Sequence, residues 1–96
     1  ERDLLSVLNN IEAQDVSPGI RQAAVWIVTD DATYQEMGSL QYLGAGRVID
    51  ATDVVSAMKL CHEAGIDIKH RAVWKDLRFL KVSREDLVDW LKEMGQ

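Results

Sequence analysis

The side chains best suited to metal binding or nucleophilic catalysis are Cys61, His62, Glu63 and His70. Adjacent residues on a helix point about 100° apart, so Cys61 and His62 do not face one ion. A structural zinc site needs four converging ligands at characteristic spacings, which this group does not supply. The same divergence keeps the His62 ring from the approach of about 3 Å that a base makes to a nucleophilic sulfur. We therefore interpret Cys61 as a buried core residue and predict no catalytic residue, no metal and no cofactor.

A second group of side chains has the composition of a binding surface. If residues 69–78 form a helix, Arg71, Trp74, Lys75 and Arg78 fall at positions i, i+3, i+4 and i+7 and share one face. Tryptophan and arginine are typical of the residues that dominate protein interfaces. The alternative is a solvated basic face over a tryptophan that completes the core. In either case, Val73 and Leu77, with the nearby Leu80, are expected to form the buried edge of this segment.

The formal net charge of −5 conceals an uneven distribution along the chain. Residues 1–68 carry four Lys or Arg against eleven Asp or Glu, a net −7, whereas residues 69–84 carry six against one, a net +5. An acidic chain is a poor nonspecific ligand for nucleic acid, because neutralisation of phosphates supplies most of that affinity. A local basic segment suits an acidic protein surface, another copy of the chain or its own acidic half.

Two further groups share only fragments of ligand-binding motifs. Asp30, Asp31, Thr33 and Glu36 offer oxygen ligands, but they lack the alternating ligands, the glycine and the distal glutamate of an EF-hand calcium loop. Helix capping accounts for these aspartates more simply. The turn at 44–46 lacks the full glycine spacing of a phosphate-binding fingerprint, so we interpret it as part of a loop.

The composition describes one soluble domain that folds without cross-links. The 96 residues are 47% hydrophobic and 28% charged, which is enough for one core in a domain of ordinary length. A single cysteine excludes an internal disulfide and leaves the compartment open. The longest apolar run, residues 23–28, is far shorter than the roughly 18–20 residues that span a bilayer. The chain opens on Glu1 rather than Met, which favours a segment excised from a larger protein.

Hydrophobic periodicity predicts that helices carry these residues. Over residues 2–14, apolar side chains repeat at the spacing of an amphipathic helix with one buried face. This face comprises Leu4, Leu8 and Ile11, widened by Leu5 and Val7. A helix over 18–29 begins at Ser17 as N-cap and Pro18 as first residue. It is apolar on most sides, which predicts a central position; a strand over 24–28 is the alternative, because strand formers are concentrated there.

Capping residues mark the remaining helices. Asp30 or Asp31 caps a short helix that ends at Met37, and a loop follows over 38–48. Asp50 as N-cap, with Asp53 three residues on, begins a helix over 51–64 that buries Val54, Val55, Met58 and Cys61.

Gly65 ends the helix over 51–64 as a left-handed cap. Helices follow over 69–77 and, with Ser83 as N-cap, over 84–94. Trp26 and Trp90 are predicted to be core residues because each lies on an apolar helix stripe. The predicted fold is an all-α, single compact bundle of about five short helices that forms one domain over residues 1–96.

One stretch resembles a known family. Gln22-Ala23-Ala24-Val25-Trp26, followed by Thr29 and Asp30, is similar to a helix motif of bacterial surface thioester domains. In that family the glutamine forms an internal thioester with a cysteine and serves covalent attachment to host amines. The family's cysteine precedes the glutamine, whereas Cys61 follows Gln22. The resemblance therefore implies a related helical scaffold from a bacterial surface or secreted protein, without the thioester.

These observations lead to an expected function. We expect a non-catalytic interaction or structural module of a larger protein, which contacts a protein partner or other domains of the same chain through Arg71, Trp74, Lys75 and Arg78. The alternatives are a catalytic or covalent-attachment domain that uses Cys61 or Gln22, and nucleic-acid binding through residues 69–84. The sequence predicts no membrane span, and both the cytoplasm and the extracytoplasmic space are compatible with it.

Overall fold

The computed structural model describes residues 2–38, 49–77 and 80–95. These residues form six α-helices and one turn of 3-10 helix: α1 (Arg2–Gln14), α2 (Pro18–Asp30), α3 (Tyr34–Gly38), α4 (Ala51–Glu63), η1 (Ile68–His70), α5 (Ala72–Lys75) and α6 (Glu85–Met94). The predicted all-α fold is confirmed, and the strand considered for 24–28 is wrong because α2 covers those residues. The loop predicted at 38–48 lies, from residue 39 onward, outside the described residues. None of the described helices is long and apolar enough to cross a membrane.

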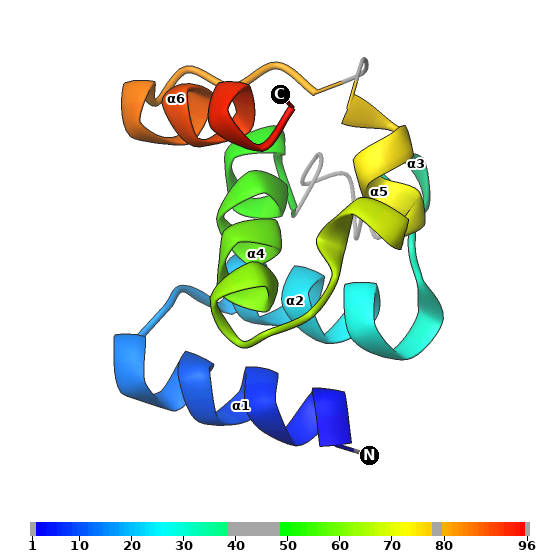
Figure 1. Ribbon diagram of the computed structural model, residues 1–96, viewed down its shortest axis with the longest axis vertical. Coiled ribbons are helices and arrows are strands. Elements are labelled where there is room, and N and C mark those ends of the chain that lie inside the picture. Colours follow the sequence, from blue (N-terminus) through cyan, green and yellow to red (C-terminus); the bar gives the residue numbers. More distant parts are fainter. Residues whose placement is uncertain (1, 39–48, 78–79, 96) are drawn as a thin grey trace, which may run out of the picture.

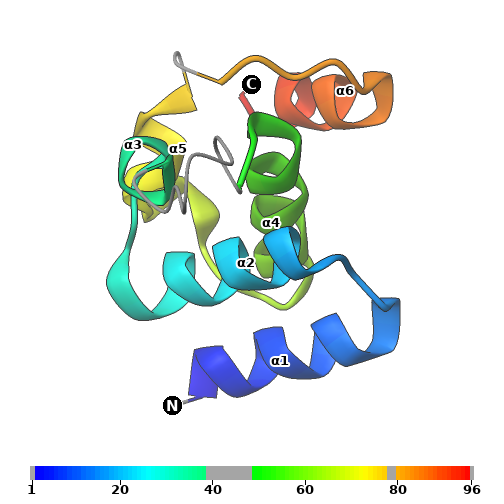
Figure 2. The same cartoon turned by 180° about the vertical axis from the view of Figure 1, so that it is seen from behind.

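Helix α4 occupies the centre of the molecule (Figure 1). It contacts α1, α2, η1 and α6. Helices α1 and α2 lie side by side near one end of the molecule, while α6 lies across the other, as both Figure 1 and Figure 2 show. The sequence pattern assigned the central position to the helix over 18–29, and this assignment is wrong. The reason is that α4 buries seven of its 13 residues, whereas α2 buries four and exposes Arg21, Gln22 and Thr29 to solvent.

Helices α2 and α4 begin at the residues predicted from the sequence, and each ends within one residue of its predicted end. Ser17 Oγ accepts a hydrogen bond from the Ile20 backbone N–H at 3.5 Å, with Pro18 in the first helical position. At the start of α4, Asp50 Oδ1 accepts the Asp53 N–H at 2.8 Å, and Asp53 Oδ2 accepts the Asp50 N–H at 3.4 Å. This reciprocal pair is a capping box, which satisfies two backbone donors that the helix leaves free.

Gly65 allows the chain to turn back after α4. Its φ of +93° lies in the left-handed region, which side chains other than glycine rarely adopt. The Gly65 N–H donates to the His62 carbonyl and the Ile66 N–H donates to the Cys61 carbonyl, both at 3.0 Å. These two bonds define a Schellman motif. The turn returns Ile66 to the core at once, with 5% of its surface exposed.

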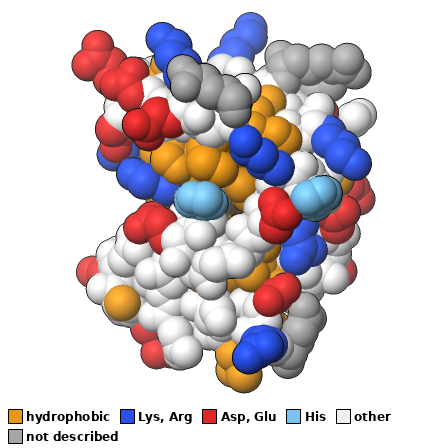
Figure 3. All heavy atoms as spheres, viewed as in Figure 1, with side chains coloured by type: hydrophobic (Ala, Val, Ile, Leu, Met, Phe, Trp, Pro, Cys, Tyr) orange, Lys and Arg blue, Asp and Glu red, His pale blue; other side chains and the backbone are white. Residues whose placement is uncertain are grey.

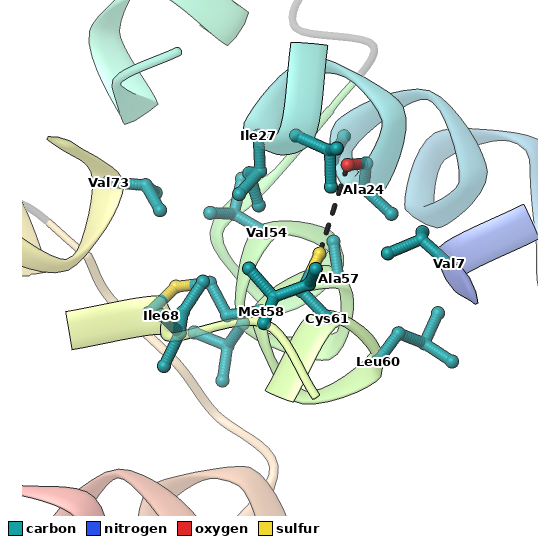
Figure 4. Packing of buried hydrophobic residues seen from close by; sticks show 14 of the residues in the cluster. Val7, Ala24, Ile27, Val54, Ala57, Met58, Leu60, Cys61, Ile68 and Val73 are labelled. Atoms are coloured by element: carbon teal, nitrogen blue, oxygen red, sulfur yellow. Dashed lines mark hydrogen bonds between the residues drawn. The ribbon is translucent and has the colours of Figure 1, made fainter. Parts of the chain in front are cut away.

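The buried side chains form one cluster around α4 (Figure 4). Val54, Met58 and Cys61 project from α4, as predicted, and are fully buried. They meet Ala24 and Ile27 from α2, and the Cys61 thiol donates to the Ala24 carbonyl oxygen at 3.8 Å. The described residues contain no buried polar or charged side chain, so burial of apolar surface is the main contribution of this cluster to stability.

Helix α1 buries fewer of its apolar side chains in the core than predicted. Val7 and Ile11 are buried, and Leu4 and Leu8 pack half-buried beside them. Leu5, predicted to widen the buried face, is instead 60% exposed. Successive side chains differ by about 100° on a helix, so a face centred on Val7 and Ile11 leaves Leu5 outside. The tryptophans also differ from one another: Trp90 is buried as predicted, whereas Trp26 is only half-buried.

The start of α3 differs from the prediction that Asp30 or Asp31 caps it. Thr33 caps this helix instead: its Oγ1 accepts the Glu36 N–H at 3.1 Å, and Glu36 Oε1 accepts the Thr33 N–H at 3.0 Å. Asp31 ends α2 as a left-handed C-cap residue with φ 50°, and its N–H donates to the Trp26 carbonyl. The side chain of Asp31 is thereby free to cap a helix from another part of the chain.

The continuous helix predicted over 69–77 is wrong, because Arg71 interrupts it. Arg71 has an extended backbone, with φ −89° and ψ 148°, between η1 and α5. Ile68 before the break and Val73 after it are both essentially fully buried. On one continuous helix these two residues would point about 140° apart, so only one could enter the core. The extended residue lets both reach it.

Helix α6 begins one residue later than predicted. Arg84 rather than Ser83 is the N-cap residue, and no side-chain hydrogen bond caps the helix. Leu87 is buried, and Leu91 and Met94 pack half-buried against the core, as their predicted stripe requires.

Candidate functional site

The candidate surface predicted from the sequence is divided between α5 and the residue before it. Trp74 and Lys75 lie on α5, whereas Arg71 is the extended N-cap residue of that helix. Arg78 lies outside the described residues. The helical spacing used to place these side chains on one face therefore does not apply to Arg71, and the common face is wrong for that residue.

Arg71 makes a contact within the protein. Its side chain is 23% exposed, and its Nη2 atom lies 3.7 Å from Oδ2 of Asp3 on α1. This ion pair joins the segment before α5 to the first helix. Asp3 therefore offsets part of the positive charge of Arg71.

Trp74 lies at the edge of the core with part of its ring accessible. It is half-buried and packs against the core cluster through the same short helix that buries Val73. The Lys69 ammonium lies 5.9 Å from the centroid of the Trp74 ring, within the range of a cation–π contact. Lys75 is exposed beside it. The described part of the surface thus comprises Trp74 with Lys69 and Lys75, which we call the Trp74 surface.

Lys69 is the member of this surface that sequence reasoning missed. On the predicted helix, Lys69 and Trp74 would lie about 140° apart and would not meet. The break at Arg71 changes this direction and brings the ammonium over the ring. The sequence did show that Lys69 begins the basic segment. It could not show that Lys69 lies over Trp74, because the interruption of the helix at Arg71 depends on tertiary contacts.

Two aspartates fix α5 against the junction of α2 and α3. Asp31 Oδ1 accepts the N–H of Ala72, the first residue of α5, at 2.8 Å. Asp76 at the other end of α5 accepts the Gln35 N–H near the start of α3 at 3.4 Å through its Oδ2 atom. Each segment therefore supplies a carboxylate to the free backbone donors of the other. These hydrogen bonds determine where the Trp74 surface lies.

A groove adjoins the Trp74 surface. It has a volume of about 430 Å³ and lies between the end of α4, η1 and the end of α6. Its lining residues are His62, Gly65, Ile66, Asp67, Ile68, Lys69 and Met94. On this side of the molecule, hydrophobic side chains gather across the upper half and are bordered by His side chains and by charged side chains of both signs (Figure 3).

The residues of the alternative catalytic site differ in their exposure to solvent. Cys61 is fully buried, and burial raises the pKa of its thiol to about 12, an effect that the nearby Arg71 only partly opposes. The thiol is therefore protonated at neutral pH. His62 is exposed and makes an edge contact with the Trp90 ring, 6.1 Å between centroids, and His70 is exposed and hydrogen-bonded to Asp67. Gln22 is exposed on α2, whereas Cys61 is enclosed.

Within the described ranges, no three His, Cys, Asp or Glu side chains converge in a way that could hold a metal ion. No protein-family model matches the chain, and no curated protein or solved structure is significantly similar to it. The resemblance to thioester domains stays a prediction. The function is therefore inferred from the chemistry of the described residues.

Proposed function

We propose that the chain is a non-catalytic interaction module that binds a protein partner, or another domain of its parent protein, through the Trp74 surface. The main support is an accessible tryptophan ring with the Lys69 ammonium 5.9 Å from its centroid and the exposed Lys75 next to it. Among the described residues, no carboxylate lies within ion-pair distance of either lysine. Tryptophan is typical of the residues that dominate protein interfaces, and unpaired cations beside it favour a partner surface of opposite charge.

The surface is also held in place before any partner arrives. The Asp31 and Asp76 hydrogen bonds fix α5 at both ends, and Val73 anchors it in the core. A side chain that is already ordered loses little conformational entropy on binding, which favours affinity. The resemblance at Gln22 supports a bacterial surface or secreted protein as the parent of this module.

Selection from a random phage-displayed peptide library tests the proposal and requires no candidate partner. We expect enriched peptides to bind the wild-type domain, to lose at least about tenfold in affinity for Trp74→Ala, and to retain part of it for Trp74→Phe. Lys75→Glu should also weaken them, whereas Lys92→Glu, the same charge change on the outer face of α6, should not. Circular dichroism verifies that each variant is folded.

Two results would contradict the proposal. One is a failure to enrich any peptide above an inert protein control. The other is a set of enriched peptides that binds the folded Trp74→Ala variant as tightly as the wild-type domain.

A further inference from the structure

The groove beside the Trp74 surface has an apolar floor. Ile66 and Ile68 form its base with 5% and 1% of their surfaces exposed, and the half-buried Met94 of α6 borders it. Gly65 contributes no side chain, so the turn after α4 leaves that part open. The groove has a volume of about 430 Å³ and is open to solvent, so it is accessible to a side chain of a partner.

One cation at this groove, the Lys69 ammonium, has no carboxylate within ion-pair distance among the described residues. Asp67 carries the one carboxylate among the described lining residues, and its Oδ2 atom is hydrogen-bonded to His70 Nδ1. The groove therefore combines apolar contact area with a cation that lacks an anion.

Lys69 also connects the groove to the Trp74 surface. It lines the groove, and its ammonium lies 5.9 Å from the Trp74 ring centroid. A ligand that pairs with this ammonium can thus contact the floor of the groove on one side and the aromatic ring on the other. Figure 3 shows a hydrophobic area on this side of the molecule, with Lys or Arg side chains among the charged residues at its border.

We propose that the groove binds a short acidic segment of a partner protein, with an apolar side chain against Met94 and Ile66 and a neighbouring carboxylate paired with Lys69. This assignment rests on the proposed interaction function and adds the chemistry of the partner. The apolar floor selects for the anchor side chain, and the unpaired ammonium selects for the carboxylate.

The test uses an array of synthetic twelve-residue peptides probed with the fluorescently labelled domain. The array contains four classes: acidic with apolar anchors, acidic without them, basic with them, and uncharged with them. We expect the acidic class with anchors to bind at least about tenfold more tightly than the others. Met94→Lys should remove the advantage of peptides with apolar anchors over those without, and Lys69→Glu should remove the advantage of acidic over basic peptides, whereas Lys92→Glu, on the opposite face of α6, should preserve both.

The outcomes separate this inference from the proposed function. If peptides bind through Trp74 but Met94→Lys has no effect, or if acidic peptides have no advantage, the groove assignment is wrong while the Trp74 surface stands. A single-stranded oligonucleotide that competes with the peptides at equal affinity would assign the groove to nucleic acid and overturn the proposal. Self-association in analytical ultracentrifugation that Met94→Lys abolishes would assign it to a second copy of the chain, with the same consequence.

Discussion

Asp31 connects two parts of the fold that lie far apart in the sequence, and its substitution is a sensitive test of the structure. Its backbone ends α2 at φ 50°, and its side chain accepts the Ala72 N–H at 2.8 Å across 41 residues. We expect Asp31→Ala to destabilise the protein through both features. It removes the acceptor at the start of α5, and it places alanine in a left-handed conformation that aspartate and asparagine tolerate better.

The magnitude follows from these two contributions. Loss of a capping side chain costs about 1 kcal/mol, and a left-handed backbone costs alanine about another 1 kcal/mol. The expected loss of about 2 kcal/mol corresponds to a decrease of roughly 10 °C in Tm for a chain of this length. Asp31→Asn keeps an acceptor oxygen and tolerates the backbone, so its loss should stay below about 1 kcal/mol. Asp76→Ala should cost less than Asp31→Ala, because the bond to the Gln35 N–H is longer, at 3.4 Å.

Urea unfolding measures these differences, and amide hydrogen exchange localises them. The Ala72 amide should exchange faster in Asp31→Ala than in Asp31→Asn, while amides in the middle of α4 should change only with global stability. Binding through the Trp74 surface should weaken in parallel, because α5 carries the ring. The reasoning is refuted if Asp31→Ala melts within about 2 °C of the wild-type protein and its Ala72 amide stays equally protected.

Three further predictions concern the core and its boundary. Burial raises the pKa of the Cys61 thiol from 9.0 to about 12 in the folded protein. Between these two pH values the thiol is ionised in the unfolded chain but protonated in the folded protein. The free energy of unfolding should therefore keep its full value below pH 9 and fall by up to about 4 kcal/mol towards pH 12. In urea unfolding, the free energy of unfolding of Cys61→Ala should lack this decrease above pH 9. A decrease equal to that of the wild-type protein would contradict the prediction. Gly65→Ala should cost about 1–2 kcal/mol in thermal unfolding from its positive φ alone, because an added Cβ meets no atom within 4 Å. Leu5→Gln should change Tm by less than about 3 °C because Leu5 is 60% exposed; a larger decrease would mean that α1 packs as the sequence pattern predicted.

Features that depend on neighbouring residues were predictable from the sequence. Ser17, Asp50 and Gly65 cap helices through atoms only a few positions away, so their roles follow from local geometry. The all-α class follows in the same way from apolar spacing repeated along each segment. The burial of Cys61 on α4 also follows from its place in that spacing.

Features that depend on distant residues were not predictable. Arg71 is extended because Ile68 and Val73 must both enter the core and because Asp31 supplies a cap from 41 residues away. The apolar spacing of this segment favoured one continuous helix, because the spacing contains no information about these contacts with distant residues. The exposure of Leu5 likewise depends on the direction from which the remaining helices approach α1.

The features of the candidate site also fall into those that the sequence determines and those that depend on tertiary contacts. The sequence by itself determined that a basic, tryptophan-bearing segment follows an acidic body, because charge and residue type are properties of the chain. Tertiary structure decided which of its cations remain unpaired: it directed Arg71 to Asp3 and brought Lys69 over the Trp74 ring. It also placed the end of α6 beside η1 to form the groove. Side-chain direction and charge pairing arise only when separate segments meet, so the composition of a site is readable before folding and its geometry is not.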